Sequence, residues 1–161
     1  MTGGKAWDHT VEGVDVPSLT VAQMREVDRL MVERYGIELI QMMEHAGRHL
    51  AHVARKRFLG GNPIGNHVVV LSGTGGNGGG ALACARRLVG WGARVSVCLT
   101  RGRESWAGVP AHQLAILERM EVSLSKTSLE IELDDLDLII DGLIGYSLDG
   151  APRNTAADLI Q

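Results

Sequence analysis

One segment constrains the fold more than any other part of the sequence. His67–Leu71 (HVVVL) is a short apolar run with three β-branched residues, and a glycine-rich stretch, Gly73–Gly80, follows almost at once. Such a run is typical of a strand that is buried on both faces of a parallel sheet. Because glycine is unfavourable inside a strand, we expect the chain to turn at Gly73–Gly80 and then to enter a helix.

The downstream sequence repeats this alternation of strands and helices. Pro110 suits the first turn of a helix whose inward face carries Leu114, Leu117 and Met120. The strands that we expect are residues 93–99, a short segment near residues 122–124, and residues 138–140, which lead into Asp141. This order is typical of a parallel α/β sheet, in which ligands bind at the carboxyl ends of the strands.

Two helices are predicted before the first strand. Thr20 and Gln23 have capping-box spacing, and an apolar stripe then runs toward Gly36. A second helical pattern covers Leu39–Phe58, with the inward face predicted to carry Met43, Ala46, Leu50 and Val53. Residues 1–18 show neither the helical nor the strand pattern of apolar residues and are interpreted as a leader. We therefore expect one domain, residues 19–161, with an α/β fold: a three-layer, Rossmann-like α/β/α sandwich with a mainly parallel sheet, preceded by two helices.

Composition excludes several classes of protein. Hydrophobic residues make up 45% and charged residues 22% of the chain, as in ordinary globular domains. No apolar run approaches the roughly 18 residues of a membrane span, and the net charge of -3 gives no footprint for nucleic acid. The two cysteines, Cys84 and Cys98, lie in apolar segments, which fits a reducing cytosol. We expect a cytoplasmic protein with neither a membrane nor a nucleic-acid partner.

The glycine-rich segment is the first candidate for a binding site. Its glycines let the backbone approach a ligand closely, and the next helix begins with free amides that favour an anion. Gly73, Gly75 and Gly78 spell G-x-G-x-x-G between a strand and a helix, the context of a dinucleotide site. The acidic residue expected about 20 positions later is absent. Thr100 and Arg101, followed by Arg103, stand there instead and suit a 2′-phosphate better than a bare ribose. The alternative is a tight turn without a ligand.

Asp141 is the second candidate, because a carboxylate at the end of an apolar run is costly to bury without a partner. It could also simply cap a turn through backbone amides. Asn77 and Asp141 together offer two oxygen ligands at neighbouring strand ends, which is the chemistry of a hard cation. His45, His49 and His52 have helical spacing for a metal cluster, but no third ligand to join His45 and His49 is evident, so we discount that interpretation.

Three motifs in order carry a resemblance to a known family. The chain contains MMEHAG, then VVVLSGTGGNGGGALACARRL, then LIIDGLIGYSLDGAPR. Together they resemble the YjeF N-terminal domain family, the NAD(P)H-hydrate epimerases, from about Leu19 to the last residue. Members of this family interconvert the R and S forms of hydrated NADH and NADPH (NADHX and NADPHX) in cofactor repair. A partner dehydratase, fused in the same polypeptide or separate, then restores the cofactor.

The resemblance also implies roles for residues of this chain. Asn77 and Asp141 would ligate a potassium ion, K+, and Asp141 would be catalytic. Two loops would contact the dinucleotide substrate: Gly76, Asn77, Gly78, Gly79 and Gly80 in the first, and Gly145, Tyr146, Ser147, Leu148, Asp149, Gly150 and Ala151 in the second. The amphipathic N-terminal helices could pack on their own sheet or on a second copy, so a homodimer stays open.

Two departures from the family pattern lead to an alternative. Gly76 and Gly80 stand where family members have Asn and Asp, and the family domain continues for several tens of residues beyond the length of this chain. We therefore expect the domain to be truncated at its C-terminus. A catalytically inactive YjeF-like nucleotide-binding or scaffold module is the alternative to an epimerase. An NADP-dependent dehydrogenase that uses the three glycines of the motif and Arg101 is a more remote hypothesis.

Overall fold

The computed structural model describes residues 10–11, 14–15, 18–126, 134–146, 148 and 150–160. It divides into two units, Met1–Gly36 and Ile37–Gln161. In the first unit, β1 (Thr10–Val11) pairs antiparallel with β2 (Val14–Asp15), and α1 (Val21–Glu33) follows. Thr20 and Gln23 form the predicted capping box at the start of α1. Most of the predicted leader, namely residues 1–9, 12, 13, 16 and 17, lies outside the described residues.

The second unit is built on a four-stranded parallel sheet, as the sequence predicts. Its strands are β3 (His67–Ser72), β4 (Arg94–Leu99), β5 (Ser123–Ser125) and β6 (Leu136–Gly142). They lie in the order β5-β4-β3-β6, and each pair of neighbours is parallel. The first and last strands in the sequence, β3 and β6, are therefore side by side, which brings Leu71 opposite Asp141.

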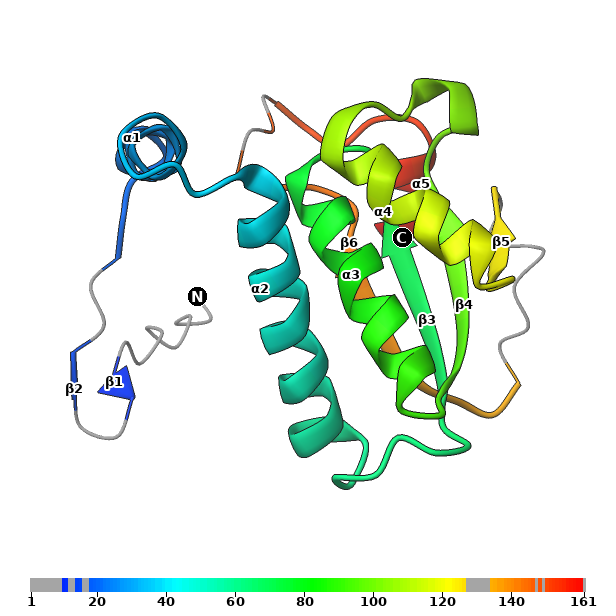
Figure 1. Ribbon diagram of the computed structural model, residues 1–161. Helices are drawn as coiled ribbons and strands as arrows, with labels where there is room; N and C mark the ends of the chain where they lie inside the picture. The colour runs from blue at the N-terminus through cyan, green and yellow to red at the C-terminus, as the bar shows by residue number, and fades with distance from the viewer. Residues whose placement is uncertain are drawn as a thin grey trace, which may run out of the picture. The chain divides into compact units, whose positions relative to one another are not determined.

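Helices cover this sheet and confirm the α/β class. They are α2 (Leu39–Val53), continued by a π-helical turn, η1 (Ala54–Phe58), α3 (Gly76–Gly90), α4 (Gly108–Arg119) and α5 (Thr155–Ile160), with a short 3-10 turn, η2 (Arg103–Ser105). In Figure 1, α2, α3 and α4 lie in front of the sheet and α5 lies behind it. None of the helices in the described part of the chain has both the length and the apolar character to cross a membrane.

The core lies between the sheet and the α2, α3 and α4 layer. Its fully buried members from strands and helices include Val68, Val70, Leu82, Leu88, Val97, Leu114 and Leu117. The prediction for α4 is confirmed at Leu114 and Leu117. It is wrong at Met120, which is 39% exposed because α4 ends one residue earlier and Met120 is only its C-cap.

The predicted inward face of α2 is correct only at Met43. The buried residues of this helix are Met43, Gly47 and Ala51, with Ala54 continuing the stripe in η1. A side chain at position 47 would overlap the Ala83 methyl group on α3, so the two helices approach too closely for large residues. At the point of closest approach, the inward residues are therefore small.

The larger apolar residues of α2 lie on its exposed side. Leu50 is 37% and Val53 is 50% exposed, and Ala46 is also exposed. Leu50 and Val53 line a cavity of about 290 Å³ beside β6, together with Phe58. The hydrophobic pattern predicted the helix correctly. It did not predict that the stripe of Met43, Gly47 and Ala51, rather than the one with Leu50 and Val53, faces α3.

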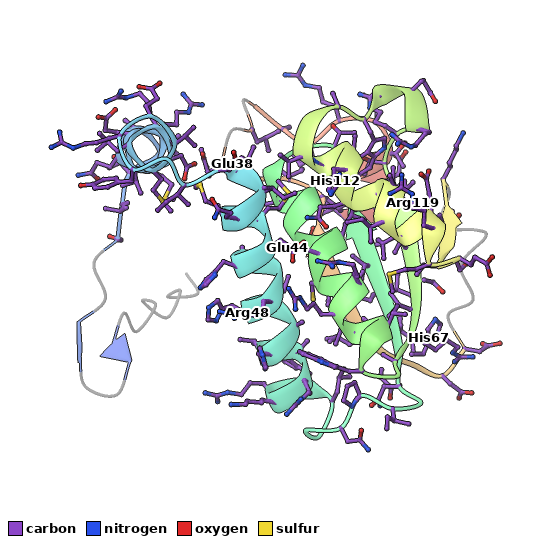
Figure 2. The ribbon with its side chains drawn as sticks, viewed as in Figure 1. Glu38, Glu44, Arg48, His67, His112 and Arg119 are labelled. Carbon is purple, nitrogen blue, oxygen red and sulfur yellow. The ribbon has the colours of Figure 1, made fainter. Side chains whose placement is uncertain are left out.

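One half-buried carboxylate, that of Glu44, links the three helices of this layer. Glu44 on α2 pairs with Arg86, and with Arg87 at 2.9 Å, both on α3. It also accepts a hydrogen bond of 2.8 Å from the Gln113 amide on α4. Figure 2 shows Glu44 on the side of α2 that faces α3. Because one carboxylate contacts both neighbouring helices, it fixes how the layer packs above the sheet.

Candidate functional site

The carboxyl ends of β3, β4 and β6 meet at one edge of the sheet. The Gly73 amide donates to the Gly142 carbonyl at 3.1 Å, which ties the end of β3 to the end of β6. The Thr100 amide donates to the Ser72 carbonyl at 3.0 Å, which ties β4 to β3. Segments that are far apart in the sequence therefore start from fixed positions at this edge.

The glycine-rich segment is helical earlier than predicted. We expected Gly76–Gly80 to be a loop, but these residues form the first turn of α3, with Gly75 as the N-cap. The Gly79 amide donates to the Gly75 carbonyl at 3.0 Å, the first hydrogen bond of the helix. Within the described part of the chain, nothing accepts a hydrogen bond from the amides of Gly76, Asn77 and Gly78. These donors and the helix dipole form a local positive end.

Close packing explains why a segment of such low helix propensity is helical here. A side chain at Gly78 would collide with the Gly73 carbonyl oxygen, and one at Gly73 would collide with the Leu143 carbonyl oxygen. The start of α3 is thus pressed against the ends of β3 and β6. Gly76 and Gly80 differ, because a methyl group at either position would meet no atom within 4 Å.

Two side chains link this turn to the segment after β6. The Asn77 amide nitrogen donates to the Ile144 carbonyl at 2.9 Å, across 67 positions in the sequence. Asp141 is exposed, and its Oδ1 accepts a hydrogen bond of 2.9 Å from the Leu143 amide. The turn-capping role that we considered for Asp141 is therefore present. Its second oxygen, Oδ2, has no hydrogen-bond donor among the described residues.

The larger of two cavities at this edge has a volume of about 640 Å³, and we call it the strand-end cavity. It is bounded by the ends of β3 and β4, the segment after β6 and the start of α5. Its lining residues are Gly73, Thr74, Gly75, Thr100, Arg101, Leu143, Ile144, Gly145, Leu148, Arg153, Asn154 and Ala156. The volume is in the range of small-molecule sites.

The smaller cavity, about 290 Å³, is called the Asp141 cavity here. It lies between α2 and the first turn of α3, and its lining residues are Ala46, Leu50, Gly76, Asn77, Gly80, Ala81 and Asp141. Of these, only Asp141 has an ionisable side chain. A single carboxylate therefore stands beside an apolar wall and free helix amides.

The structure distributes the predicted site residues between these places. Gly76, Asn77, Gly80 and Asp141 line the Asp141 cavity, whereas Gly145 and Leu148 line the strand-end cavity. Gly78 and Gly79 are buried in packing contacts instead. Tyr146, Gly150 and Ala151 are exposed and line neither cavity, and Ser147 and Asp149 lie outside the described residues.

Several lining residues were not singled out from the sequence. Ile144 contributes its backbone carbonyl, for which no side-chain pattern exists. Arg153 lies within the third motif, but it reaches the cavity only because the chain folds back after β6. Leu50 and Ala46 were expected in the core, so no signal marked them as wall residues of a site.

The oxygen atoms near Asn77 suit a cation better than the histidines do. Asn77 and Asp141 line one cavity, and amide and carboxylate oxygens are ligands that hard cations prefer. In the described ranges, no three His, Cys, Asp or Glu side chains are grouped to hold a metal ion. The His45 and His49 rings contact each other in a tilted arrangement, with centroids 5.1 Å apart, and His45 contacts Arg48 rather than a further ligand.

Two groups with shifted pKa values, Cys84 and Asp137, have structural roles. Burial raises the pKa of the Cys84 thiol to about 12, so this thiol stays protonated and unreactive. A hydrogen bond of 2.8 Å from the His67 amide, helped by the Asn66 side chain, holds the pKa of Asp137 below its usual value. Asp137 thereby connects β6 to β3 at the end of the sheet opposite the cavities.

Comparison with known proteins gives a consistent set of relatives. Residues 39–161 match the model of a family described as YjeF-related protein N-terminus. An NAD(P)H-hydrate epimerase of Dehalogenimonas lykanthroporepellens is 42% identical over 152 residues, which cover 94% of this chain and 61% of the relative. A bifunctional NAD(P)H-hydrate repair enzyme, Nnr, of Salinibacter ruber is 32% identical, over 92% of this chain and 30% of its own length.

A solved structure agrees with these sequence matches. The crystal structure of the yeast protein YNL200c superposes with a TM-score of 0.74 at 27% identity, and the match covers 86% of this chain and 61% of the yeast chain. The chain thus spans about three fifths of the length of this protein and of the epimerase.

Proposed function

We propose that this chain, which belongs to the family of YjeF-related protein N-termini, epimerises the R and S forms of hydrated NADH and NADPH. One observation carries the proposal: Asp141 and Asn77 line a single cavity together with the free amides at the start of α3. Relatives named NAD(P)H-hydrate epimerase support it.

Binding of the substrate rests on the backbone of the glycine-rich segment. The diphosphate of a dinucleotide carries negative charge, which the amides of Gly76 and Asn77 and the helix dipole favour. The strand-end cavity adjoins this turn through Gly73 and Gly75 and has room for one end of the dinucleotide. The hydrated nicotinamide ring would then lie in the Asp141 cavity, whose wall of Ala46, Leu50 and Ala81 is apolar.

Asp141 is suited to hold and return the one proton that the reaction moves. Epimerisation breaks the bond between C6 and its hydroxyl oxygen, with the ring nitrogen lone pair filling the vacancy, and the oxygen leaves as water after it gains a proton. Water then adds to the opposite face of C6 and loses a proton. The proton count balances, so one carboxyl group can donate and then accept. The Leu143 amide holds Oδ1 and leaves Oδ2 for this transfer.

The same two side chains are proposed to hold a potassium ion. The Asn77 amide orients its Oδ1 by donating its own hydrogen to Ile144, and the Asp141 carboxylate supplies negative charge in the same cavity. When bound there, the ion would supply positive charge that offsets the charge of the diphosphate. The histidines of α2, His45, His49 and His52, are not proposed as ligands of this ion.

The proposed partner is an NAD(P)H-hydrate dehydratase. Relatives named bifunctional NAD(P)H-hydrate repair enzyme, such as the Salinibacter ruber protein, indicate that two repair activities can share one polypeptide. Whether this protein is joined to a dehydratase or works beside a separate one follows from the full gene sequence. A homodimer stays a prediction, which sedimentation of the purified protein tests.

The function is tested by epimer interconversion. One epimer of NADHX is isolated by chromatography, incubated with the full-length purified protein, and the other epimer is measured over time. We expect equilibration well above the spontaneous rate, and loss of that acceleration in Asp141→Asn. A rate equal to the spontaneous one for both NADHX and NADPHX contradicts the proposal.

A nucleotide-binding module without turnover is the second candidate. It is favoured by the lack of side chains at two lining positions of the Asp141 cavity, because Gly76 and Gly80 supply no polar group there. The space at position 80 admits a larger residue, so Gly80→Asp should fold. ADP-ribose binding without epimerisation in the natural chain, together with epimerisation in Gly80→Asp, would select this candidate.

A further inference from the structure

We propose that Arg101 makes the strand-end cavity selective for a dinucleotide that carries a 2′-phosphate on its adenosine ribose, so that NADPHX is preferred over NADHX. The inference rests on the proposed function, because it assigns the substrate preference of the same site.

The position of Arg101 within the fold supports this role. β3, the glycine-rich turn, α3 and β4 form one strand-helix-strand unit, and Arg101 lies two residues after β4 ends. In dinucleotide-binding units of this kind, the residue at the end of the second strand contacts the adenosine ribose. An acidic residue there binds the free 2′-hydroxyl, whereas an arginine accommodates a 2′-phosphate. Arg101 and Gly73 line the same cavity, as the unit requires.

The backbone of Arg101 is held in place while its side chain is exposed. The Trp106 indole, which is 6% exposed, donates a hydrogen bond of 3.2 Å to the Arg101 carbonyl. On the other side, the Thr100 amide is bonded to the end of β3. No described residue forms a hydrogen bond or ion pair with the Arg101 guanidinium group. The backbone at Arg101 is therefore fixed beside the cavity, and no contact among the described residues competes with a ligand anion for its guanidinium group.

The other arginines near the cavity are less suited than Arg101 to bind the 2′-phosphate. Arg103 is paired with Glu118 at 3.1 Å and does not line the cavity. Arg153 lines it but is already engaged within the molecule. No carboxylate is present among the described lining residues, so nothing there repels a phosphate dianion. Arginine binds phosphate through paired, charge-assisted hydrogen bonds.

The closing experiment compares Arg101→Gln with Arg94→Gln, which removes an exposed arginine at the opposite end of the same strand. Binding is measured by calorimetry with adenosine 2′,5′-bisphosphate and with adenosine 5′-monophosphate. We expect the natural protein and Arg94→Gln to bind the bisphosphate at least tenfold more tightly, and Arg101→Gln to lose that difference. Arg101→Lys should retain part of it and guards against a folding defect in the glutamine variant.

Catalytic constants separate this inference from the proposed function. For an active enzyme, the ratio of kcat/KM for NADPHX to that for NADHX should fall in Arg101→Gln and keep its natural value in Arg94→Gln. Selective bisphosphate binding without epimerisation would contradict the function and leave the inference standing. Equal affinities for the two nucleotides, or selectivity that survives in Arg101→Gln, would overturn the inference whatever the catalytic result.

Discussion

Glycines of the same short segment are present for different reasons. Gly78 has no room for a methyl group, because the Gly73 carbonyl oxygen already fills that space. Gly76 and Gly80 have open space beside them and face the Asp141 cavity. The first residue serves the packing of α3 on the sheet, and the other two leave the site wall free of side chains. Residue type alone does not separate these roles.

This difference predicts opposite effects on stability. Gly78→Ala should lower the free energy of unfolding by about 1–3 kcal/mol, because an overpacked site forces the backbone to shift. Gly76→Ala should raise it by roughly 0.5 kcal/mol, since alanine has the higher helix propensity and meets no atom. Urea unfolding of both variants checks this. Equal destabilisation by the two substitutions would show that the first turn of α3 is not packed as described.

Asp141→Asn tests the single ionisable group of its cavity. The amide retains an acceptor for the Leu143 amide, so the melting temperature should change little. It cannot donate and take back a proton, so kcat should fall by about 10²-fold or more. Epimer interconversion followed by chromatography measures the loss. Asp158→Asn, on the exposed surface of α5, is the matched control and should be fully active.

At the scale of secondary-structure elements, the helix layer depends on Glu44. Burial by itself would raise the pKa of this carboxyl group. Hydrogen bonds from Gln113 and Arg87 and the charges of Arg86 and Arg87 outweigh that effect and hold the pKa below the usual 4.5. The charged form is therefore the one that stabilises the contact between α2, α3 and α4.

The lowered pKa of Glu44 predicts how stability depends on pH. A carboxyl group whose pKa is lower in the folded state stabilises the protein above its unfolded pKa, near 4.5, and loses that effect as pH falls through the lower folded value. Glu44→Gln should thus be less stable than the natural protein at pH 7, with the difference shrinking below about pH 4.5. Thermal melts across this range measure it. Glu121→Gln, at an exposed position outside this contact, is the matched control.

At the scale of the whole molecule, the site is assembled from the ends of three strands and from parts of three helices, α2, α3 and α5, of one unit. The two cavities adjoin the same turn, one through Gly73 and Gly75 and the other through Gly76 and Asn77. Asn77 also contacts Ile144, which lines the larger cavity. A ligand that fills both cavities would therefore hold α3, β6 and the segment after β6 together.

This assembly predicts that ADP-ribose and potassium each stabilise the folded protein and that their effects reinforce each other. ADP-ribose should raise the melting temperature, because a ligand that binds only the folded state adds about 2.7 kcal/mol at a hundredfold excess over its Kd. The increase should be larger in KCl than in LiCl of equal ionic strength if Asn77 and Asp141 hold potassium. Differential scanning fluorimetry provides the readout. The potassium-dependent part should vanish in Asp141→Asn, and its persistence there would place the ion elsewhere.

The strands and some of the helix ends could be predicted because their signals are local. The apolar run at residues 67–71, the capping box at Thr20 and the limits of the 39–58 helix need only neighbouring residues. Asn77 and Asp141 could also be predicted as neighbours, because the ends of parallel strands meet at one edge. The inward face of α2 could not be, since it depends on how closely α3 approaches at Gly47.

The sequence by itself determined that this chain forms a parallel α/β sheet with polar residues at its carboxyl edge, because strand and turn patterns are written in consecutive residues. Only the tertiary structure decided that Gly76–Gly80 is helix rather than loop, and that the Asn77 amide meets the Ile144 carbonyl. Both depend on β6 lying beside β3, a contact between segments some 70 residues apart. Such contacts involve backbone atoms and free space, for which the residue pattern along the chain contains no signal.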